Sequence, residues 1–192
     1  MTSLVIAKRA LRAALLERRQ AQPDRDRLSA RICSALAPLL DGARIVALYW
    51  PIGAEVDPRP ALDALAARGV VTCLPRIVAP AQPLAFHRWR PGDPLLEGRL
   101  GTAEPAATAP LVTPDHLVVP LVGFDARLYR LGYGGGYYDR TLAALRRQGR
   151  AQAIGVAFAC QEVDRVPAGR YDQRLDKIVT ETGLFGTGAG PA

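Results

Sequence analysis

Several residue types that support common enzyme classes are scarce in this 192-residue chain. It has two histidines, His87 and His116, and no serine after Ser34, so a serine–histidine hydrolase would be hard to build. No apolar run approaches the roughly 18 residues that a membrane-spanning helix needs. Aromatic residues make up only 6% of the chain, and no known nucleic-acid-binding motif is visible. Phosphoryl transfer needs neither histidine nor serine, because positioning and charge neutralisation carry most of its catalysis. The scarcity therefore favours phosphate chemistry.

Cysteine is also sparse. Cys33, Cys73 and Cys160 are odd in number, lie far apart and match no zinc or redox spacing. We expect buried, reduced thiols in a reducing compartment. The start of the chain lacks the uninterrupted apolar stretch of a secretory signal, so we expect a soluble, cytoplasmic protein.

Positive charge is concentrated at the start of the chain. The formal net charge is +7 and the pI is about 9.8. Residues 1–31 carry Lys8 and seven arginines against three acidic residues, so 8 − 3 = +5 of that charge lies there. Two interpretations stay open: attraction for polyanions such as nucleic acid, or a local site for a small, highly charged phosphate ligand. A nucleic-acid-binding module is therefore the alternative from another class, although the low aromatic content disfavours it.

Helical and strand-like segments alternate along the chain. Leu4, Ala7, Leu11 and Leu15 recur at helical spacing, whereas short β-rich runs end at turn residues. The predicted helices cover 3–20, a segment capped by Asp24 that continues to about 39, 57–68, and a segment from a glycine-rich turn to about 148. The predicted strands are 44–50, 70–76, 84–89, 116–124, 151–158 and 177–182.

This alternation predicts an α/β fold, a single three-layer α/β/α domain with a largely parallel, Rossmann-like sheet. The run 116–124 (HLVVPLVGF) is nearly all apolar, as expected of a strand buried on both faces. We expect one domain over 1–192, with its core at about 5–184 and a flexible tail at 186–192. Residues 79–115 contain seven prolines and form the least regular part, and a loop of that length is often functional.

The strongest local signal is the sequence RLGYGGGYYDR at 130–140, between a predicted strand and a predicted helix. Ligands bind at that place in open α/β sheets. Glycines let backbone N–H groups approach an anion, and the following helix adds a favourable dipole. The motif is not a dinucleotide fingerprint, which needs glycine in place of Tyr137, nor a P-loop, which needs Gly-Lys-Ser/Thr. A turn whose glycines serve only tight packing is the structural alternative.

Carboxylates near this turn are candidate magnesium ligands. Asp139 should lie in the first turn of the helix, where it either interacts with the helix dipole or binds Mg²⁺ beside substrate phosphates. Asp172 and Asp176 are candidates for a second carboxylate, with turn and surface roles as the alternative.

Charged and aromatic residues elsewhere extend the candidate site. Lys8 and Arg12 lie four residues apart and project from one face of the first helix, where such a like-charge pair costs about 0.2–0.5 kcal/mol. They suit adjacent phosphates, and a solvated basic face is the alternative. Glu55 follows Trp50 at a strand end, where a carboxylate and an aromatic ring can meet a ligand. An exposed turn acid is the alternative there.

Several segments occur together in an order that is typical of one family. They are the Lys8–Arg12 pair, Leu48-Tyr49-Trp50 with Glu55, Leu74-Pro75-Arg76, Glu104-Pro105, Val119-Pro120 to Phe124-Asp125 with 130–140, 154–158 with Gln161, and Asp172 to Asp176. In these segments the chain resembles the 5-formyltetrahydrofolate cyclo-ligases, also called methenyltetrahydrofolate synthetases. The resemblance covers about 5–184, and the glycine–tyrosine block is its most specific part.

The resemblance implies ATP- and Mg²⁺-dependent cyclisation of 5-formyltetrahydrofolate to 5,10-methenyltetrahydrofolate, with release of ADP and phosphate. In this reaction the formyl oxygen is phosphorylated. The implied partner is the small-molecule folate, with or without a polyglutamate tail, and the implied protein is a monomer. Another ATP-dependent enzyme with a non-folate substrate is the nearer alternative.

The resemblance also implies roles for individual residues. The catalytic positions are Arg130, Tyr138 and Asp139. The substrate-binding positions are Trp50, Glu55, Tyr133, Gly134, Gly135, Gly136 and Tyr137. The metal ligands are Asp139 and Asp172. The ATP-binding positions are Lys8, Arg9, Arg12, Arg130, Leu131, Gly132, Tyr133, Gly134, Gly135, Gly136, Tyr137 and Tyr138.

Three positions depart from the family pattern. Leu128 stands where glycine is usual, which predicts a differently shaped turn before Arg130. Tyr171 stands where histidine usually precedes the second metal aspartate. Leu100 replaces a usual aromatic residue, so one stacking contact with folate is expected to be missing.

Overall fold

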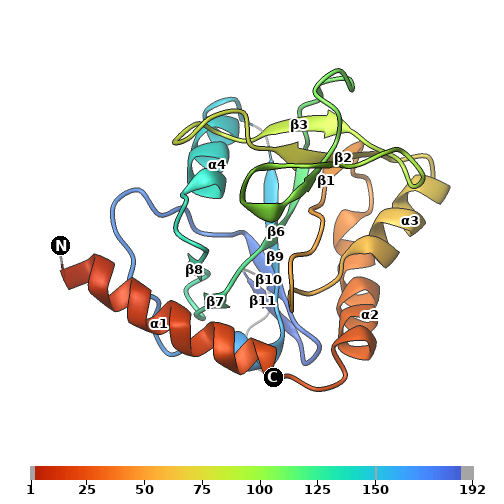
Figure 1. Cartoon of the computed structure of the whole chain (residues 1–192). Helices are drawn as coiled ribbons and strands as arrows, with labels where there is room; N and C mark the ends of the chain where they lie inside the picture. Colours follow the sequence, from red (N-terminus) through yellow and green to blue (C-terminus); the bar gives the residue numbers. More distant parts are fainter. Residues whose placement is uncertain (1–2, 150, 187–192) are drawn as a thin grey trace.

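A seven-stranded sheet forms the centre of the computed structural model, which describes residues 3–149 and 151–186 (Figure 1). The strand order is β11-β10-β9-β6-β1-β2-β3. The five inner strands pair in parallel, and both edge strands pair antiparallel. The strands are β1 (Ile45–Ala47), β2 (Val71–Arg76), β3 (Ala85–Arg88), β6 (His116–Pro120), β9 (Gln152–Val156), β10 (Lys177–Val179) and β11 (Leu184–Gly186). The predicted α/β fold with a largely parallel sheet is confirmed.

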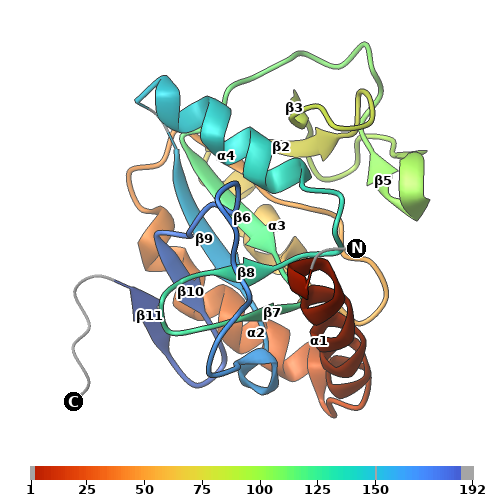
Figure 2. The ribbon, with the colours of Figure 1, turned by 90° about the vertical axis from the view of Figure 1, so that its left-hand side faces the viewer.

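Helices cover both faces of this sheet. On one face lie α2 (Arg25–Leu36), the 3-10 helix η1 (Ala37–Leu40) and α3 (Arg59–Ala67), and on the other lies α4 (Tyr137–Arg147) (Figures 1 and 2). Helix α1 (Ser3–Gln20) lies outside the three layers. It contacts segments that follow β6 and β9, so it crosses the edge where the parallel strands end. This edge is where ligands bind in open α/β sheets.

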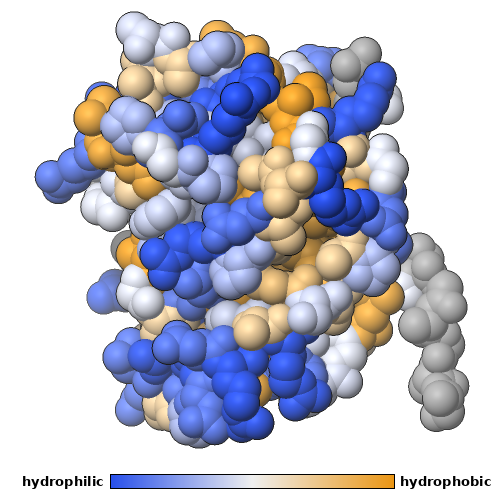
Figure 3. All heavy atoms as spheres, turned by 90° about the vertical axis from the view of Figure 1, so that its right-hand side faces the viewer, coloured by the Kyte–Doolittle hydropathy of each residue, from blue (hydrophilic) through white to orange (hydrophobic). Residues whose placement is uncertain are grey.

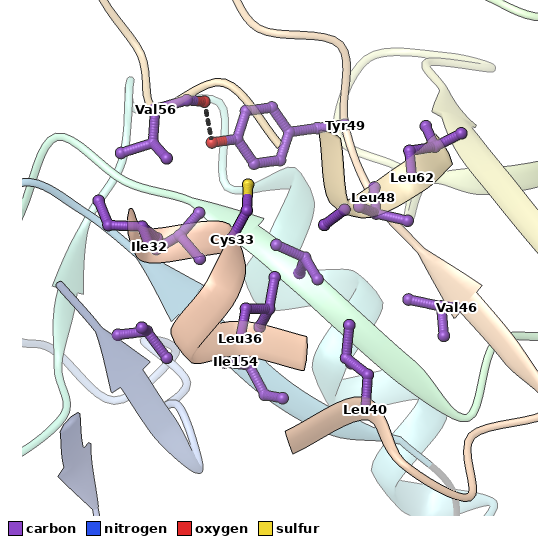
Figure 4. Packing of buried hydrophobic residues seen from close by; sticks show 14 of the residues in the cluster. Ile32, Cys33, Leu36, Leu40, Val46, Leu48, Tyr49, Val56, Leu62 and Ile154 are labelled. Carbon is purple, nitrogen blue, oxygen red and sulfur yellow. Dashed lines mark hydrogen bonds between the residues drawn. The ribbon is translucent and has the colours of Figure 1, made fainter. Parts of the chain in front are cut away.

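The larger core cluster packs α2 and α3 against the sheet. Ile32 and Leu36 recur at helical spacing and are completely buried, which stabilises the fold by about 1.5–3 kcal/mol for each side chain. Figure 4 shows these side chains beside Ile154 of β9. In the same view the Tyr49 hydroxyl donates a 2.7 Å hydrogen bond to the Val56 carbonyl. That bond closes the loop after β1, which carries Glu55.

The basic start of the chain is divided between surface and interior. On the face that carries α2 and α3, hydrophilic side chains gather along the lower edge, where α1 ends and α2 begins (Figure 3). Arg18 and Arg27 are exposed there. Arg19, by contrast, is only 4% exposed. A uniform solvated basic face therefore does not describe this segment.

The predicted strand 116–124 is divided in the structure. β6 ends at Pro120, which has no N–H to donate to a neighbouring strand. After a break, β7 (Gly123–Phe124) pairs antiparallel with β8 (Arg130–Leu131) in a separate small sheet. The glycine-rich segment thus begins as a strand, and its turn is confined to 132–136.

Other predicted boundaries also change. Asp24 takes the position before α2 in a left-handed conformation and makes no side-chain cap. Its carboxylate pairs with Arg27 instead. The irregular region contains β4 (Leu96–Glu97), η2 (Arg99–Gly101) and β5 (Ala103–Glu104). Gly186, placed in the tail by the prediction, pairs with Lys177. The rest of that tail, 187–192, lies outside the described residues.

The three cysteines behave as expected of unreactive thiols. Cys33 and Cys73 are buried, Cys160 is partly buried, and all three are free. Burial raises the pKa of Cys33 to about 11. None of the helices in the described part of the chain is both long and apolar enough to span a membrane.

Candidate functional site

The glycine-rich turn adopts backbone conformations that only glycine accepts readily. Gly134 has φ of 103° and Gly136 has φ of 65°, both in the left-handed region. Gly136 directly precedes α4 and offers no side chain to cap it. The first backbone N–H groups of an α-helix have no partner within the helix, so this end of α4 can bind an anion.

Helix α1 brings Arg12 to this turn and Lys8 to the segment that carries Asp172. Arg12 Nε donates a 2.8 Å hydrogen bond to the Gly132 carbonyl. Lys8 Nζ lies 2.6 Å from both carboxylate oxygens of Asp172. Arg9 is exposed and makes no hydrogen bond or ion pair with any residue that the structure describes. Its predicted ATP contact stays a prediction.

Asp139 joins three segments of the chain. Its Oδ1 accepts hydrogen bonds of 2.9 Å from Arg130 Nη2 and from the Gln173 backbone N–H. Arg130 Nη1 in turn donates to the Gln173 carbonyl at 2.7 Å. Burial lowers the pKa of Arg130, and the Asp139 carboxylate opposes that effect. Asp139 therefore does more than interact with the helix dipole.

Asp139 and Asp172 lie in neighbouring parts of the site, because Asp139 contacts the backbone of Gln173, the next residue after Asp172. Both carboxylates also act electrostatically on Arg130. No group of three His, Cys, Asp or Glu residues suited to a metal is found in 3–149 and 151–186. Two carboxylates fit Mg²⁺ when phosphates supply further oxygens.

Asp176, the other candidate second carboxylate, has a structural role. Its Oδ2 accepts a 2.7 Å hydrogen bond from the Ala153 N–H at the start of β9, and it pairs with Arg146 at 3.2 Å. These contacts give Asp176 a role in fastening β9, and its candidacy as a second carboxylate stays a prediction.

Glu55 lies in a small cluster with buried Arg19 and half-exposed Tyr133. Glu55 is 8% exposed, and its Oε1 lies 3.9 Å from Arg19 Nη1. Arg19 Nη2 donates a 2.5 Å hydrogen bond to the Tyr133 hydroxyl. Burial raises the pKa of Glu55, whereas the Ile52 N–H, Arg19 and Tyr133 oppose the rise. Glu55 is not the exposed turn acid considered as its alternative.

The remaining residues of the turn differ in what they can offer a ligand. Leu131 is buried among Leu15 of α1, Val122 and Val166, so its backbone is the part that can contact a nucleotide. Tyr137 lies under the Arg140 guanidinium, 5.3 Å from its ring centre. Burial raises the pKa of Tyr138, and the charge of Glu55 adds to this effect. The Tyr138 phenol therefore stays protonated and can donate a hydrogen bond.

Trp50 lies apart from the glycine-rich turn. Its ring meets Trp89 edge-on, with 5.6 Å between centres, and carries the Arg59 guanidinium at 5.1 Å. These three residues line a cavity of about 550 Å³ beside α3. No hydrogen bond or ring contact joins Trp50 to the turn in the described structure. Its predicted folate contact stays a prediction.

Leu128 keeps the backbone conformation that the usual glycine would favour. Its φ is 67°, and its N–H donates to the Asp125 carbonyl at 2.9 Å. The side chain is 5% exposed and packs into the second core cluster. Leu128 thus takes a left-handed conformation that glycine adopts more readily, and the expected difference in turn shape stays a prediction.

Leu128→Gly is expected to destabilise the protein by about 2 kcal/mol, the middle of the range that two opposing effects give. Truncating a buried leucine costs about 2–5 kcal/mol, and relief of the left-handed strain returns about 1–2 kcal/mol. Leu128→Ala keeps the strain and loses the contacts, so it should be the less stable of the two variants. Urea unfolding measures both. A glycine variant as stable as the wild type would show that packing here contributes little.

The other two departures from the family pattern are Tyr171 and Leu100. Tyr171 is 71% exposed, and the Arg170 guanidinium lies 4.4 Å from its ring centre. Leu100 belongs to η2, and its side chain lies outside what the structure describes. The missing stacking contact with folate remains a prediction.

Three residues at this site were not selected from the sequence as ligand contacts. Arg19 shares one helical face with Lys8, Arg12 and Leu15, a spacing that could have identified it. Asp125 is fully buried and organises the loop before β8 by accepting hydrogen bonds from backbone N–H groups, including that of Val166 at 2.8 Å. Gln173 contributes through its backbone, which no sequence pattern reveals.

A glycine-rich turn before a helix, two cations of α1 and two carboxylates meet at the carboxyl edge of a parallel sheet. They define an α/β protein with a candidate phosphate-binding site. Residues 5–181 match the sequence profile of the 5-formyltetrahydrofolate cyclo-ligase family, and the chain belongs to this family.

Individual relatives cover most of the chain. The chain is 35% identical to 5-formyltetrahydrofolate cyclo-ligase of Escherichia coli over 74% of its own length and 81% of the relative. It is 32% identical to the cyclo-ligase of Mycolicibacterium smegmatis over 91% and 93%. The solved structure of 5,10-methenyltetrahydrofolate synthetase from Aquifex aeolicus superposes with a TM-score of 0.81 at 31% identity, covering 96% and 95% of the two chains.

Proposed function

We propose that this chain uses ATP to cyclise 5-formyltetrahydrofolate to 5,10-methenyltetrahydrofolate, releasing ADP and phosphate. One observation in this member of the cyclo-ligase family carries the proposal. From α1, Arg12 reaches Gly132 of the glycine-rich turn, and Lys8 reaches Asp172. This arrangement suits a triphosphate, because charge-assisted hydrogen bonds from lysine and arginine are strong.

The reaction needs a phosphate because the formyl group is unreactive. A formamide carbon is a poor electrophile, and its oxygen is a poor leaving group. Transfer of the γ-phosphoryl group to that oxygen makes the carbon electrophilic and the oxygen a leaving group. The nitrogen at position 10 then attacks the carbon and gives up its proton, the five-membered ring closes, and phosphate departs as the carbon–oxygen bond breaks. The attacking nitrogen and the nitrogen that carries the formyl group belong to one bound molecule, so proximity supplies much of the rate.

Each part of the site has a role in this scheme. Lys8, Arg12 and the N-terminal end of α4 bind the phosphates, and Arg130 stabilises the charge that develops during transfer. Asp139 and Asp172 would hold Mg²⁺, which supplies charge neutralisation when it is bound. Glu55 and Tyr133 bind the pterin ring, and the Tyr138 phenol donates a hydrogen bond to the substrate.

The activity is tested by mixing the protein with MgATP and 5-formyltetrahydrofolate and following methenyl absorbance together with ADP. We expect equal amounts of methenyl product and ADP, and neither product when ATP or the folate is omitted. ATP binding without methenyl product would refute the folate assignment and leave the alternative of an ATP-dependent enzyme with another substrate. Oligonucleotide binding that survives physiological salt would support the nucleic-acid alternative.

The same proposal covers the compartment, the oligomeric state and the polyglutamate tail of the substrate. We infer a cytoplasmic monomer that also accepts polyglutamylated folates. Sedimentation at several protein concentrations measures the oligomeric state, and KM values for the mono- and pentaglutamate forms measure the effect of the tail.

A further inference from the structure

Arg19 is a buried cation for which the scheme above has no role. It lies on α1 one turn beyond Leu15, on the face that also carries Lys8 and Arg12. The side chain reaches three other segments. Nη1 lies 3.9 Å from Glu55 Oε1 and 3.4 Å from the Leu121 carbonyl, and Nη2 donates to the Tyr133 hydroxyl. Arg19 thus links the ATP-binding helix to the loop after β1, the end of β6 and the glycine-rich turn.

The contacts of Arg19 are incomplete for a purely structural ion pair. Its Nε–H is buried without any hydrogen-bond partner in the described structure, which costs about 1–3 kcal/mol. The separation of 3.9 Å from Glu55 is also long for a charge-assisted hydrogen bond. Well-packed apolar residues often replace such buried pairs without loss of stability. Stability by itself therefore does not explain an arginine here.

The cluster reaches the surface through Tyr133. This side chain is 50% exposed, and the Arg19 guanidinium lies 5.7 Å from its ring centre. Glu55 and Tyr133 are the two residues to which the proposed function gives the pterin. The same guanidinium contacts both side chains. It donates a hydrogen bond to the Tyr133 hydroxyl and places its charge beside Glu55, whose Oε2 also accepts a 2.9 Å hydrogen bond from the Ile52 N–H.

We propose that Arg19 is a positioning residue of the folate site, which holds Glu55 and Tyr133 in the arrangement that binds the reduced pterin and couples this arrangement to helix α1. The inference rests on the proposed function. In this arrangement the helix that carries the phosphate-binding cations also determines the geometry of the pterin-binding side chains. Arg19 itself does not touch the reacting atoms.

The charge on Arg19 also affects the ionisation of Glu55. The charged and titratable groups that face Glu55 are Arg19 from α1, Tyr133 from the turn, Tyr138 from α4 and Tyr49 from the end of β1. Arg19 is the one cation among them. Burial raises the pKa of Glu55, and Arg19 holds that rise down. Without Arg19 the pKa of Glu55 should rise further, so more of Glu55 is protonated at a given pH.

The test compares Arg19→Met with Arg18→Met by steady-state kinetics from pH 5 to pH 9. Arg18 is the adjacent arginine, and it is exposed and bonded to the Cys160 and Glu162 carbonyls. We expect Arg19→Met to raise KM for 5-formyltetrahydrofolate about tenfold or more, with KM for ATP changed less than about threefold, because one charge-assisted contact is worth about tenfold in affinity. The acid limb of kcat/KM for the folate should move to higher pH. Arg18→Met should match the wild type in all three measurements.

Two further variants separate positioning from folding. Arg19→Lys keeps the charge but loses the two guanidinium nitrogens that reach Glu55 and Tyr133. It should therefore restore the pH profile of kcat/KM without restoring KM for the folate. In a Glu55→Gln background the Arg19→Met substitution should no longer move the pH profile. Thermal unfolding of each variant checks that the comparison concerns folded protein.

Certain results would overturn the inference even though the wild type is active. They are equal effects of Arg19→Met and Arg18→Met, an equal rise of both KM values, or an unmoved acid limb. Absence of methenyl product from the wild-type protein would instead refute the proposed function. The two failures are therefore distinguishable.

Discussion

Asp139→Asn is expected to reduce kcat about 100-fold or more while leaving the fold intact. The amide oxygen can still accept the hydrogen bonds from Arg130 and Gln173, which lie 2.9 Å from the carboxylate. The negative charge is lost, so the site loses a proposed Mg²⁺ ligand and Arg130 loses its counter-charge. Removing one electrostatic stabiliser of a transition state commonly costs 10²–10³-fold in rate, so we expect about that loss here.

The measurement is kcat at saturating substrates over a series of Mg²⁺ concentrations, with thermal unfolding of the same sample. Excess Mg²⁺ should recover only a small part of the lost activity. Asp176→Asn is the matched control, because Asp176 fastens β9 through the Ala153 N–H and Arg146. It should lower stability more than kcat. Wild-type turnover by Asp139→Asn would return Asp139 to a helix-capping and loop-fastening role.

Lys8→Ala is expected to raise KM for ATP about 10–100-fold and to affect KM for the folate much less. Lys8 is partly exposed, and its ammonium group is bound to Asp172 rather than buried in the core. Its removal should therefore cost ATP affinity without unfolding the protein. A hydrogen bond to a charged group contributes about 1.5–3 kcal/mol, which corresponds to about 10–100-fold in binding.

Arg27→Ala is the control for the charge that Lys8→Ala removes. Arg27 is an exposed residue of α2, and its partner is Asp24. If general attraction for the nucleotide matters, both variants should weaken ATP use equally at low salt, and the effect should fade at physiological salt. A Lys8→Ala variant that loses folate affinity more than ATP affinity would show that α1 serves the other ligand.

Two ion pairs within the site affect how it is expected to bind MgATP. Lys8 neutralises Asp172, and Arg130 neutralises Asp139, so both proposed metal ligands already have a basic partner. Binding of MgATP would bring negative phosphates to the cations and a positive ion to the carboxylates. The site therefore carries both charge types that a metal–nucleotide complex requires, arranged in adjacent pairs.

Local patterns in the sequence were sufficient for the framework. The alternation of helical and β-rich runs predicted the layered α/β fold, because each run must bury one apolar face or stripe. The spacing of Lys8 and Arg12 predicted a shared direction on one helix, and the position of Asp139 in the first turn of α4 follows from the glycines before it. These features depend on residues within a few positions of one another.

Boundaries were less predictable where distant pairing decides them. The run 116–124 looks like one strand, yet it breaks after Pro120 because Gly123–Phe124 pairs with Arg130–Leu131. The last strand, Leu184–Gly186, exists only because Lys177–Val179 provides an edge. No local pattern in the sequence predicts either of these strand pairings.

What the sequence determined by itself is the fold class, the position of the glycine-rich turn and the residue types gathered around it. Only the tertiary structure decided which of these residues meet. Lys8 meets Asp172 across 164 positions, and Arg19 meets Tyr133 across 114. Trp50 and Glu55 are five residues apart but lie in different surroundings. Such contacts depend on how helices pack across the edge of the sheet. Packing brings together residues whose separation along the chain does not predict that they touch.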